Sequence, residues 1–181
     1  MKDAETLLKE QLKAGPGGVY LLYGEEPYLV DTYTRQIARA IVPDPADVFN
    51  YQQLDGEETT PEQLAQAVTA LPMLADKLCV TVRDMDLGAH SDKIVALLQE
   101  LPDSTVLVFR QVNRQPDRRK KGWQAVLKQV DAIGLAVSFA RRNPAQLQTI
   151  LIAGAKHRGC WLDAAGAALL AEQAGNDLYL L

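Results

Sequence analysis

Cysteine and histidine are scarce in this sequence of 181 residues, which contains two of each. Cys79 and Cys160 lie far apart, and neither belongs to a C-x-x-C pair, so the common redox and zinc motifs are excluded. We expect both cysteines to be reduced thiols in packed surroundings. With only His90 and His157 besides, the sequence offers too few ligands for a structural metal cluster.

Long hydrophobic runs and a secretory leader are also missing. No stretch approaches the ~18 consecutive apolar residues that a membrane helix requires. The first six residues form a polar segment, unlike the basic and then apolar start of a signal peptide. With 48% apolar and 23% charged residues, the composition is that of a globular chain. The sequence therefore predicts a soluble, cytoplasmic protein that does not associate with membranes.

Motifs for nucleotide binding and for hydrolysis are absent as well. A phosphate loop, G-x-x-x-x-G-K-[ST], would follow the first apolar run at Gly24. The residues there, Gly24-Glu25-Glu26-Pro27, include no lysine and bring two carboxylates whose charge would repel a phosphate. Neither G-x-G-x-x-G at this loop nor a G-x-S-x-G elbow is present. We therefore expect no catalytic residues, no nucleotide cofactor and no bound metal.

The apolar pattern of the first three quarters of the chain alternates between two periods. Runs rich in β-branched and aromatic residues predict five strands, at 19–23, 48–54, 78–82, 105–109 and 135–139. Helical spacing predicts helices at 27–41, near 93–101 and around 123–130, and a further helix that begins with a capping box of Thr60 and Gln63. Strands separated by helices indicate parallel crossovers. We expect an α/β fold with a parallel five-stranded sheet covered by helices on both faces.

The pattern changes after Arg142, where no further strand is predicted. Helices are expected at 144–158 and 164–174, and the glycines that follow them are typical helix stops. We therefore place an α/β domain at 1–141 and a small all-helical domain at 142–181. Asn176 and Asp177 have the pattern of another helix cap, so we expect the helical domain to continue beyond Leu181.

The segment 70–76 carries large apolar side chains where a loop is expected. The helix before it would complete its apolar stripe at Leu71, and Pro72 disfavours further helix. Met73 and Leu74 fall outside that stripe. They either pack beneath the sheet or face outward, where each could contribute about 1.5–3 kcal/mol when a partner buries it.

Charge is unevenly distributed, although the formal net charge is only −4. Residues 1–60 carry 11 acidic and 5 basic side chains, whereas residues 110–158 carry 11 basic and 2 acidic ones. Such asymmetry marks some surfaces that bind nucleic acid or an acidic partner, and it also occurs on ordinary solvated helices.

Two carboxylates, Asp84 and Asp86, follow the third predicted strand. Paired carboxylates in this position resemble the magnesium-holding part of a nucleotidase, but without a phosphate loop they have no phosphate to organise. A loop that is simply polar and solvated explains them without any ligand, and we favour that interpretation. They leave a metal- or nucleotide-dependent α/β enzyme as one alternative function, and the charge asymmetry leaves a general DNA-binding module as another.

Four segments, in order and spacing, resemble the delta subunits of bacterial DNA polymerase III. These are the clamp-opening subunits of the replicative clamp loader. The similarity rests on the segments YLLYGEEPYL at 20–29, LPMLADK at 71–77, PDRRKK at 116–121 and the pair AKHRG…LD and GNDL between 155 and 178. The resemblance implies an AAA+-like fold with a degenerate phosphate loop, followed by a helical lid domain. It also implies a subunit without ATPase activity of its own in a DNA-directed DNA polymerase holoenzyme, a nucleotidyltransferase complex.

The resemblance further implies which residues bind the partners. Met73 and Leu74, supported by Leu71 and Pro72, would insert into an apolar cleft on the sliding clamp (the beta subunit) and open its ring. The family often has a bulkier aromatic residue where Leu74 stands. The other clamp-loader subunits are implied partners of the full-length protein, whose collar domain has no counterpart in these 181 residues.

DNA is a further partner that the resemblance allows, through the assembled loader. The residues expected to face it are the basic ones of the third segment: Arg118, Arg119, Lys120 and Lys121. Contacts to the phosphate backbone provide affinity without sequence preference.

Overall fold

The computed structural model describes residues 3–44, 47–175 and 177–180. The chain divides into two compact units, Met1–Phe139 and Ala140–Leu181. The first unit combines strands with helices, and the elements of the second are helices.

The first unit contains a five-stranded sheet in which every pair of neighbouring strands is parallel. Its strands are β1 (Gly18–Gly24), β2 (Tyr51–Asp55), β3 (Leu78–Arg83), β4 (Thr105–Gln111) and β5 (Gly134–Phe139), in the spatial order β2-β3-β4-β1-β5. Because β1, β3 and β4 are buried over nearly their whole length, they appear in the sequence as continuous apolar runs. The predicted parallel α/β sheet is confirmed.

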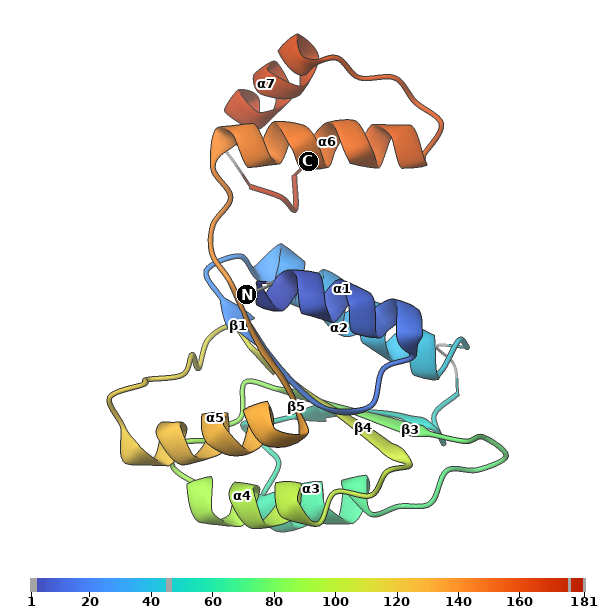
Figure 1. Ribbon diagram of the computed structural model, residues 1–181, viewed down its shortest axis with the longest axis vertical. Helices are drawn as coiled ribbons and strands as arrows, with labels where there is room; N and C mark the ends of the chain where they lie inside the picture. The colour runs from blue at the N-terminus through green and yellow to red at the C-terminus, as the bar shows by residue number, and fades with distance from the viewer. Residues whose placement is uncertain (1–2, 45–46, 176, 181) are drawn as a thin grey trace. The chain divides into compact units, whose positions relative to one another are not determined.

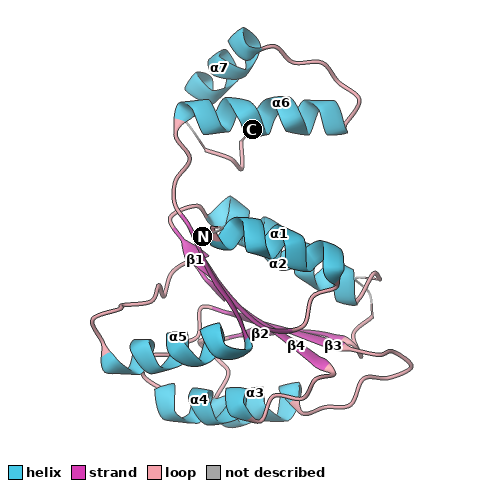
Figure 2. Ribbon diagram, viewed as in Figure 1, coloured by secondary structure: helices cyan, strands magenta, loops and turns pink. Residues whose placement is uncertain are grey.

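Helices cover both faces of this sheet (Figures 1 and 2). On one face lie α1 (Ala4–Ala14) and α2 (Pro27–Ile41), and on the other lie α3 (Pro61–Val68), α4 (Ser91–Gln99) and α5 (Lys121–Ile133). The larger part of the core fills the space between the sheet and α3, α4 and α5, where Leu21, Phe109 and Trp123 are buried. On the opposite face Tyr33 of α2 stacks on Phe139 of β5, with ring centroids 5.2 Å apart.

The capping box that starts α3 is present as predicted. The Thr60 hydroxyl accepts a hydrogen bond from the backbone N–H of Gln63 at 3.2 Å, and the Gln63 side chain accepts one from the Thr60 N–H at 2.8 Å. Two N–H groups that the first helical turn would leave unpaired are thereby satisfied.

The predicted end of this helix is wrong, because α3 ends at Val68 and does not reach Leu71. A longer helix would need an N–H from Pro72 to bond to the Val68 carbonyl, and proline has none. The Thr105 hydroxyl donates to that carbonyl instead, at 2.8 Å. Leu71 therefore does not continue the apolar stripe of the helix and is 84% exposed.

The predicted start of the second strand is also too early. β2 begins at Tyr51, because residues 48–50 form a turn. The Asp47 carboxylate accepts hydrogen bonds from the backbone N–H groups of Phe49 and Asn50, at 3.0 and 2.9 Å. Local bonds of this kind compete with strand pairing.

The two cysteines are free, but they differ in their surroundings. Cys79 is buried in β3, and this burial raises the pKa of its thiol to about 12. Cys160 is exposed, so the expectation of packed surroundings holds for Cys79 only.

The second unit contains the helices α6 (Pro144–His157) and α7 (Ala164–Gln173). A capping box of Asn143 and Gln146 starts α6, and the Asp163 carboxylate accepts from the Gly166 N–H at 2.7 Å to cap α7. Asn176, part of the expected third cap, lies outside the described residues. Among the helices of the described residues, none has the length and apolar character needed to cross a membrane.

Candidate functional site

The loop between α3 and β3, residues 69–77, exposes the apolar side chains that the sequence analysis singled out. Leu71 is 84% and Met73 54% exposed, Leu74 is fully exposed, and Pro72 is partly buried. Of the two alternatives that the sequence left open, packing beneath the sheet is therefore wrong and the outward orientation is found. We call residues 69–77 the docking loop.

A buried asparagine from another part of the chain holds the docking loop in place. The side-chain oxygen of Asn50 accepts a hydrogen bond from the Met73 N–H at 2.7 Å, and its amide nitrogen donates to the Met73 carbonyl at 2.8 Å. The same amide nitrogen donates to the Asp47 carboxylate at 2.8 Å. Sequence reasoning missed Asn50, because its partner lies 23 residues away and no local motif marks such a pair.

Further bonds hold the two ends of the docking loop. At its start the Val68 carbonyl accepts from Thr105, and near its end the Lys77 ammonium donates to the Pro16 carbonyl at 2.8 Å. Between them Leu74 has a φ of +54°, a left-handed conformation that non-glycine residues rarely adopt. These bonds hold the backbone at Val68, Met73 and Lys77 while the apolar side chains face outward.

The chemistry of the docking loop suits binding rather than reaction. Its prominent side chains are aliphatic or thioether groups, which can neither transfer protons nor act as nucleophiles under ordinary conditions. Exposed large apolar side chains on a fixed backbone match an apolar cleft on a partner, where a few buried residues commonly supply most of the affinity.

The basic segment 118–121 lies in a different part of the first unit. In Figure 1 the chain that enters α5 and the docking loop lie on opposite sides of this unit. The structure therefore does not bring the two predicted sites together.

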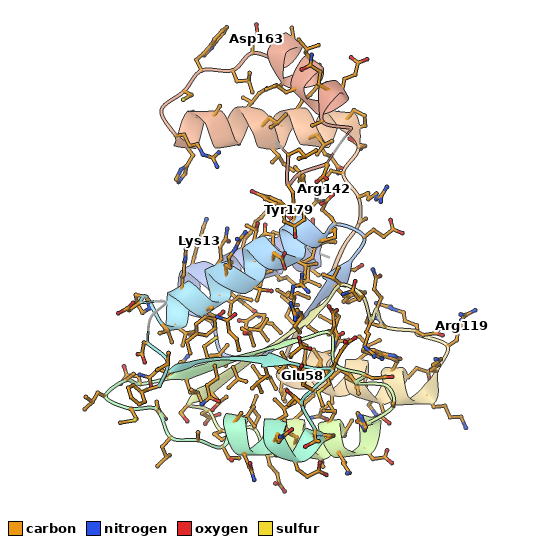
Figure 3. All side chains as sticks on the ribbon, turned by 180° about the vertical axis from the view of Figure 1, so that it is seen from behind. Lys13, Glu58, Arg119, Arg142, Asp163 and Tyr179 are labelled. Carbon is orange, nitrogen blue, oxygen red and sulfur yellow. The ribbon has the colours of Figure 1, made fainter. Side chains whose placement is uncertain are left out.

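Two of the four basic side chains in this segment have partners inside the unit. Arg118 donates to the Tyr23 hydroxyl at 3.2 Å, and this hydrogen bond raises the pKa of the guanidinium. Arg119 pairs with the Asp117 carboxylate at 3.1 Å, although it projects away from the fold (Figure 3). Lys120 and Lys121 are exposed, which leaves their ammonium groups accessible to an anionic partner.

Asp84, one of the two candidate metal ligands, is used inside the fold. One carboxylate oxygen accepts from the backbone N–H groups of Val112 and Asn113, at 2.7 and 2.8 Å. The other accepts from the Asn113 side chain at 2.9 Å and from Arg110 at 3.2 Å. Because these four donors surround the buried carboxylate, it serves to hold the segment after β4.

Asp86, the second candidate, has separate partners. Its carboxylate accepts from the Ala89 N–H at 3.0 Å and from Arg114 at 3.4 Å. Nowhere in residues 3–44, 47–175 and 177–180 do three or more His, Cys, Asp or Glu side chains form a group that could hold a metal ion. The pattern after the third strand therefore belongs to two local hydrogen-bond networks.

The loop between β1 and α2, where a phosphate loop would lie, is closed by internal bonds. The Glu26 N–H donates to the Phe139 carbonyl at 3.1 Å, and Pro27, the first residue of α2, has no N–H to offer. Gly24 has a φ of +134°, and a Cβ at this position would lie 2.3 Å from the Phe139 oxygen. The buried Glu26 adds a carboxylate at the helix end that would otherwise attract an anion.

A cavity of about 500 Å³ lies between α2 and strands β2 to β4 and includes residues that the sequence analysis did not single out. Arg110 and Asp31 in its wall form an ion pair at 2.5 Å, and Arg83 pairs with Asp55. Opposite charges therefore pair along part of this wall, to which Arg35 adds a third guanidinium group.

Comparison with known proteins gives one family match. The model of the family described as "DNA polymerase III, delta subunit" matches residues 20–137. No curated protein matches the chain in sequence.

Solved structures share the fold. The Bacillus subtilis DNA clamp loader delta protein matches with a TM-score of 0.71 and 19% identity, over 97% of this chain and 54% of its own. A DNA polymerase III gamma subunit-related protein from Thermotoga maritima matches with a TM-score of 0.53 and 18% identity, over 96% of this chain and 60% of its own. A RuvB mutant from Thermotoga maritima matches with a TM-score of 0.56 and 12% identity, over 98% of this chain and 57% of its own. The chain thus spans little more than half the length of the proteins it matches, and it shares their AAA+-like α/β fold.

Proposed function

Because the chain belongs to the DNA polymerase III delta subunit family of clamp-loader proteins, which act in DNA replication, we propose that its docking loop binds the sliding clamp and opens the ring. Met73 and Leu74 enter an apolar cleft of the clamp, and Leu71 and Pro72 support them. One observation carries this proposal: Met73 and Leu74, which the family resemblance assigns to the clamp, are exposed apolar residues of a loop whose backbone is held by Asn50.

The expected energy of this contact is considerable. Burial of a Leu or Met side chain contributes about 1.5–3 kcal/mol, so the pair supplies several kcal/mol. Opening a closed ring needs a difference in affinity, because a ligand shifts an equilibrium only as far as it prefers one state. The loop therefore binds the open clamp more tightly than the closed clamp.

The same proposal includes the absence of catalysis. The Glu26 N–H is bonded to Phe139 and Pro27 has no N–H, which supports a subunit that does not hydrolyse ATP. The internal role of Asp84 supports one without a catalytic metal. The energy of nucleotide hydrolysis then comes from other subunits of the loader, which are the further partners of the full-length protein.

Binding to the sliding clamp tests the proposal directly. The 181-residue chain is compared with a Met73→Ala, Leu74→Ala double variant and with Ile133→Ala, a partly exposed apolar residue at the end of α5. We expect the double variant to bind more than about 100-fold more weakly, since about 1.4 kcal/mol corresponds to a factor of ten. Ile133→Ala keeps the affinity of the unchanged chain.

Circular dichroism and the thermal midpoint confirm that each variant is folded. Equal affinity of the double variant and the unchanged chain would contradict the assignment of the contact to Met73 and Leu74. An unchanged chain that does not bind the clamp at all would contradict the function itself.

A further inference from the structure

The first unit exposes a second pair of large apolar side chains, next to the docking loop. Val48 is 72% and Phe49 62% exposed, in the turn that precedes β2. Apart from the docking loop, the other exposed large apolar residues in the described part of this unit are Leu7 and Ile133, at 37% each.

Hydrogen bonds connect this turn to the docking loop. Asn50, the residue after Phe49, binds both the N–H and the carbonyl of Met73 through its side chain. Its own carbonyl accepts from the Cys79 N–H at 2.8 Å, at the start of β3. The turn and the docking loop therefore lead into the adjacent parallel strands β2 and β3 at the same end of the sheet. The Asn50 side chain is bonded between them.

The conformation of the turn is also fixed. The Asp47 carboxylate accepts from the N–H groups of Phe49 and Asn50 and from the Asn50 side chain. These bonds hold the pKa of the Asp47 carboxyl below its usual range. The hydrogen bonds to Asp47 thus hold the turn that presents Val48 and Phe49.

A stable interface with the sliding clamp would bury more surface than the docking loop alone provides. A stable, specific interface buries about 800 Å² per partner, well beyond what two side chains such as Met73 and Leu74 can cover. Aromatic residues are enriched in the centre of such interfaces. Phe49 and Val48 supply additional apolar surface on a turn that the buried Asn50 joins to the docking loop by hydrogen bonds.

We propose that the turn 47–50 is the second part of the clamp-binding surface, with Phe49 as a direct contact and Asn50 as a positioning residue. This inference rests on the proposed function, since the occupant of the surface is the same sliding clamp. Val48 extends the contact at its rim.

The test compares Phe49→Ala and Val48→Ala with two references, the Met73→Ala, Leu74→Ala double variant and Ile133→Ala. Affinity for the purified sliding clamp is measured for each variant of the 181-residue chain. We expect Phe49→Ala to weaken binding by about tenfold and Val48→Ala by about threefold, as burial of such side chains implies. Ile133→Ala stays within about twofold of the unchanged chain.

A second measurement separates contact from an indirect effect on the loop. The photoreactive residue p-benzoylphenylalanine replaces Phe49 in one sample and Ile133 in another, and each is irradiated with the clamp. Cross-linking from position 49 but not from position 133 supports the direct contact. Weakened binding of Phe49→Ala without any cross-link from position 49 overturns it.

The remaining outcomes distinguish this inference from the proposed function. If the double variant loses binding while Phe49→Ala and Val48→Ala bind normally, the turn is not part of the interface and the docking loop acts alone. If the unchanged chain does not bind the clamp, the proposed function fails and this inference fails with it. If the double variant binds as tightly as the unchanged chain, the contact is not at Met73 and Leu74, and the turn is not the second part of that surface.

Discussion

At the scale of single residues, Asn50 is important for the site although no motif in the sequence marks it. It is buried, and its side chain forms both hydrogen bonds that fix the Met73 backbone and a third to Asp47. Buried polar groups that lose their partners are costly, because water cannot replace the missing bond. The backbone position of Met73 thus depends on a buried amide group that does not belong to the exposed apolar surface.

Replacement of this amide provides a test. We expect Asn50→Ala to lower the free energy of unfolding by about 1–3 kcal/mol, the usual effect of leaving buried donors and acceptors unpaired. Asp76→Ala, at an exposed position of the same loop, should stay within about 0.5 kcal/mol of the unchanged chain. Urea denaturation measures both variants, and equal stability of the two would show that the Asn50 bonds contribute little.

The same scale shows why the site could be predicted only in part. Thr60 and Gln63 lie three residues apart, so their capping box is visible in the sequence. Met73 and Leu74 are visible as apolar residues outside a helical stripe. The pairing of Asn50 with Met73 arises only when β2 and β3 lie side by side, and no sequence pattern specifies which asparagine meets which loop.

At the scale of elements, the buried strands were predicted well and the ends of elements less so. Continuous apolar runs reveal β1, β3 and β4, because both faces of a parallel sheet are covered. The start of β2 depends on the Asp47 turn, and the end of α3 depends on the bond between Thr105 and Val68. These are polar contacts that hydrophobic periodicity does not register.

The segments after β3 and β4 provide a test at this scale. Asp84→Ala removes a buried carboxylate that binds two backbone N–H groups, Asn113 and Arg110. We expect a loss of about 3 kcal/mol in unfolding free energy, because the Arg110 charge and two amides lose a partner. Asp86→Ala, at a more exposed position, should cost less than about 1 kcal/mol. Chemical denaturation measures both.

Magnesium distinguishes this structural role from that of a metal ligand. A ligand of the native state raises the thermal midpoint, so millimolar Mg²⁺ should leave the midpoint of the unchanged chain where it is. A rise that disappears in Asp84→Ala would instead favour the metal-dependent enzyme.

At the scale of the whole molecule, the uneven charge separates into paired and accessible groups. Arg118 and Arg119 have partners in Tyr23 and Asp117, whereas Lys120 and Lys121 are exposed at the start of α5. Because the Arg119 side chain is also largely exposed, it is accessible too, and we expect the two lysines to meet DNA phosphates in an assembled loader.

Salt dependence tests this role of the two lysines. In a loader assembled with the full-length subunit, we expect Lys120→Ala, Lys121→Ala to weaken retention on DNA. The slope of log affinity against log salt should fall by about 0.9 for each phosphate that a lysine no longer neutralises. Lys13→Ala, an exposed lysine of α1, serves as the control. A slope identical to that of the unchanged loader would remove DNA from the partners of this segment.

The left-handed backbone at Leu74 has a consequence for the rate of association. A flexible loop must search for its bound conformation after the first encounter, which slows productive binding. Here the conformation is already set by the folded chain, through the bonds at Val68, Met73 and Lys77. We therefore expect the loop to bind the clamp without a slow conformational search, and side-chain size at position 74 to act on the lifetime of the complex.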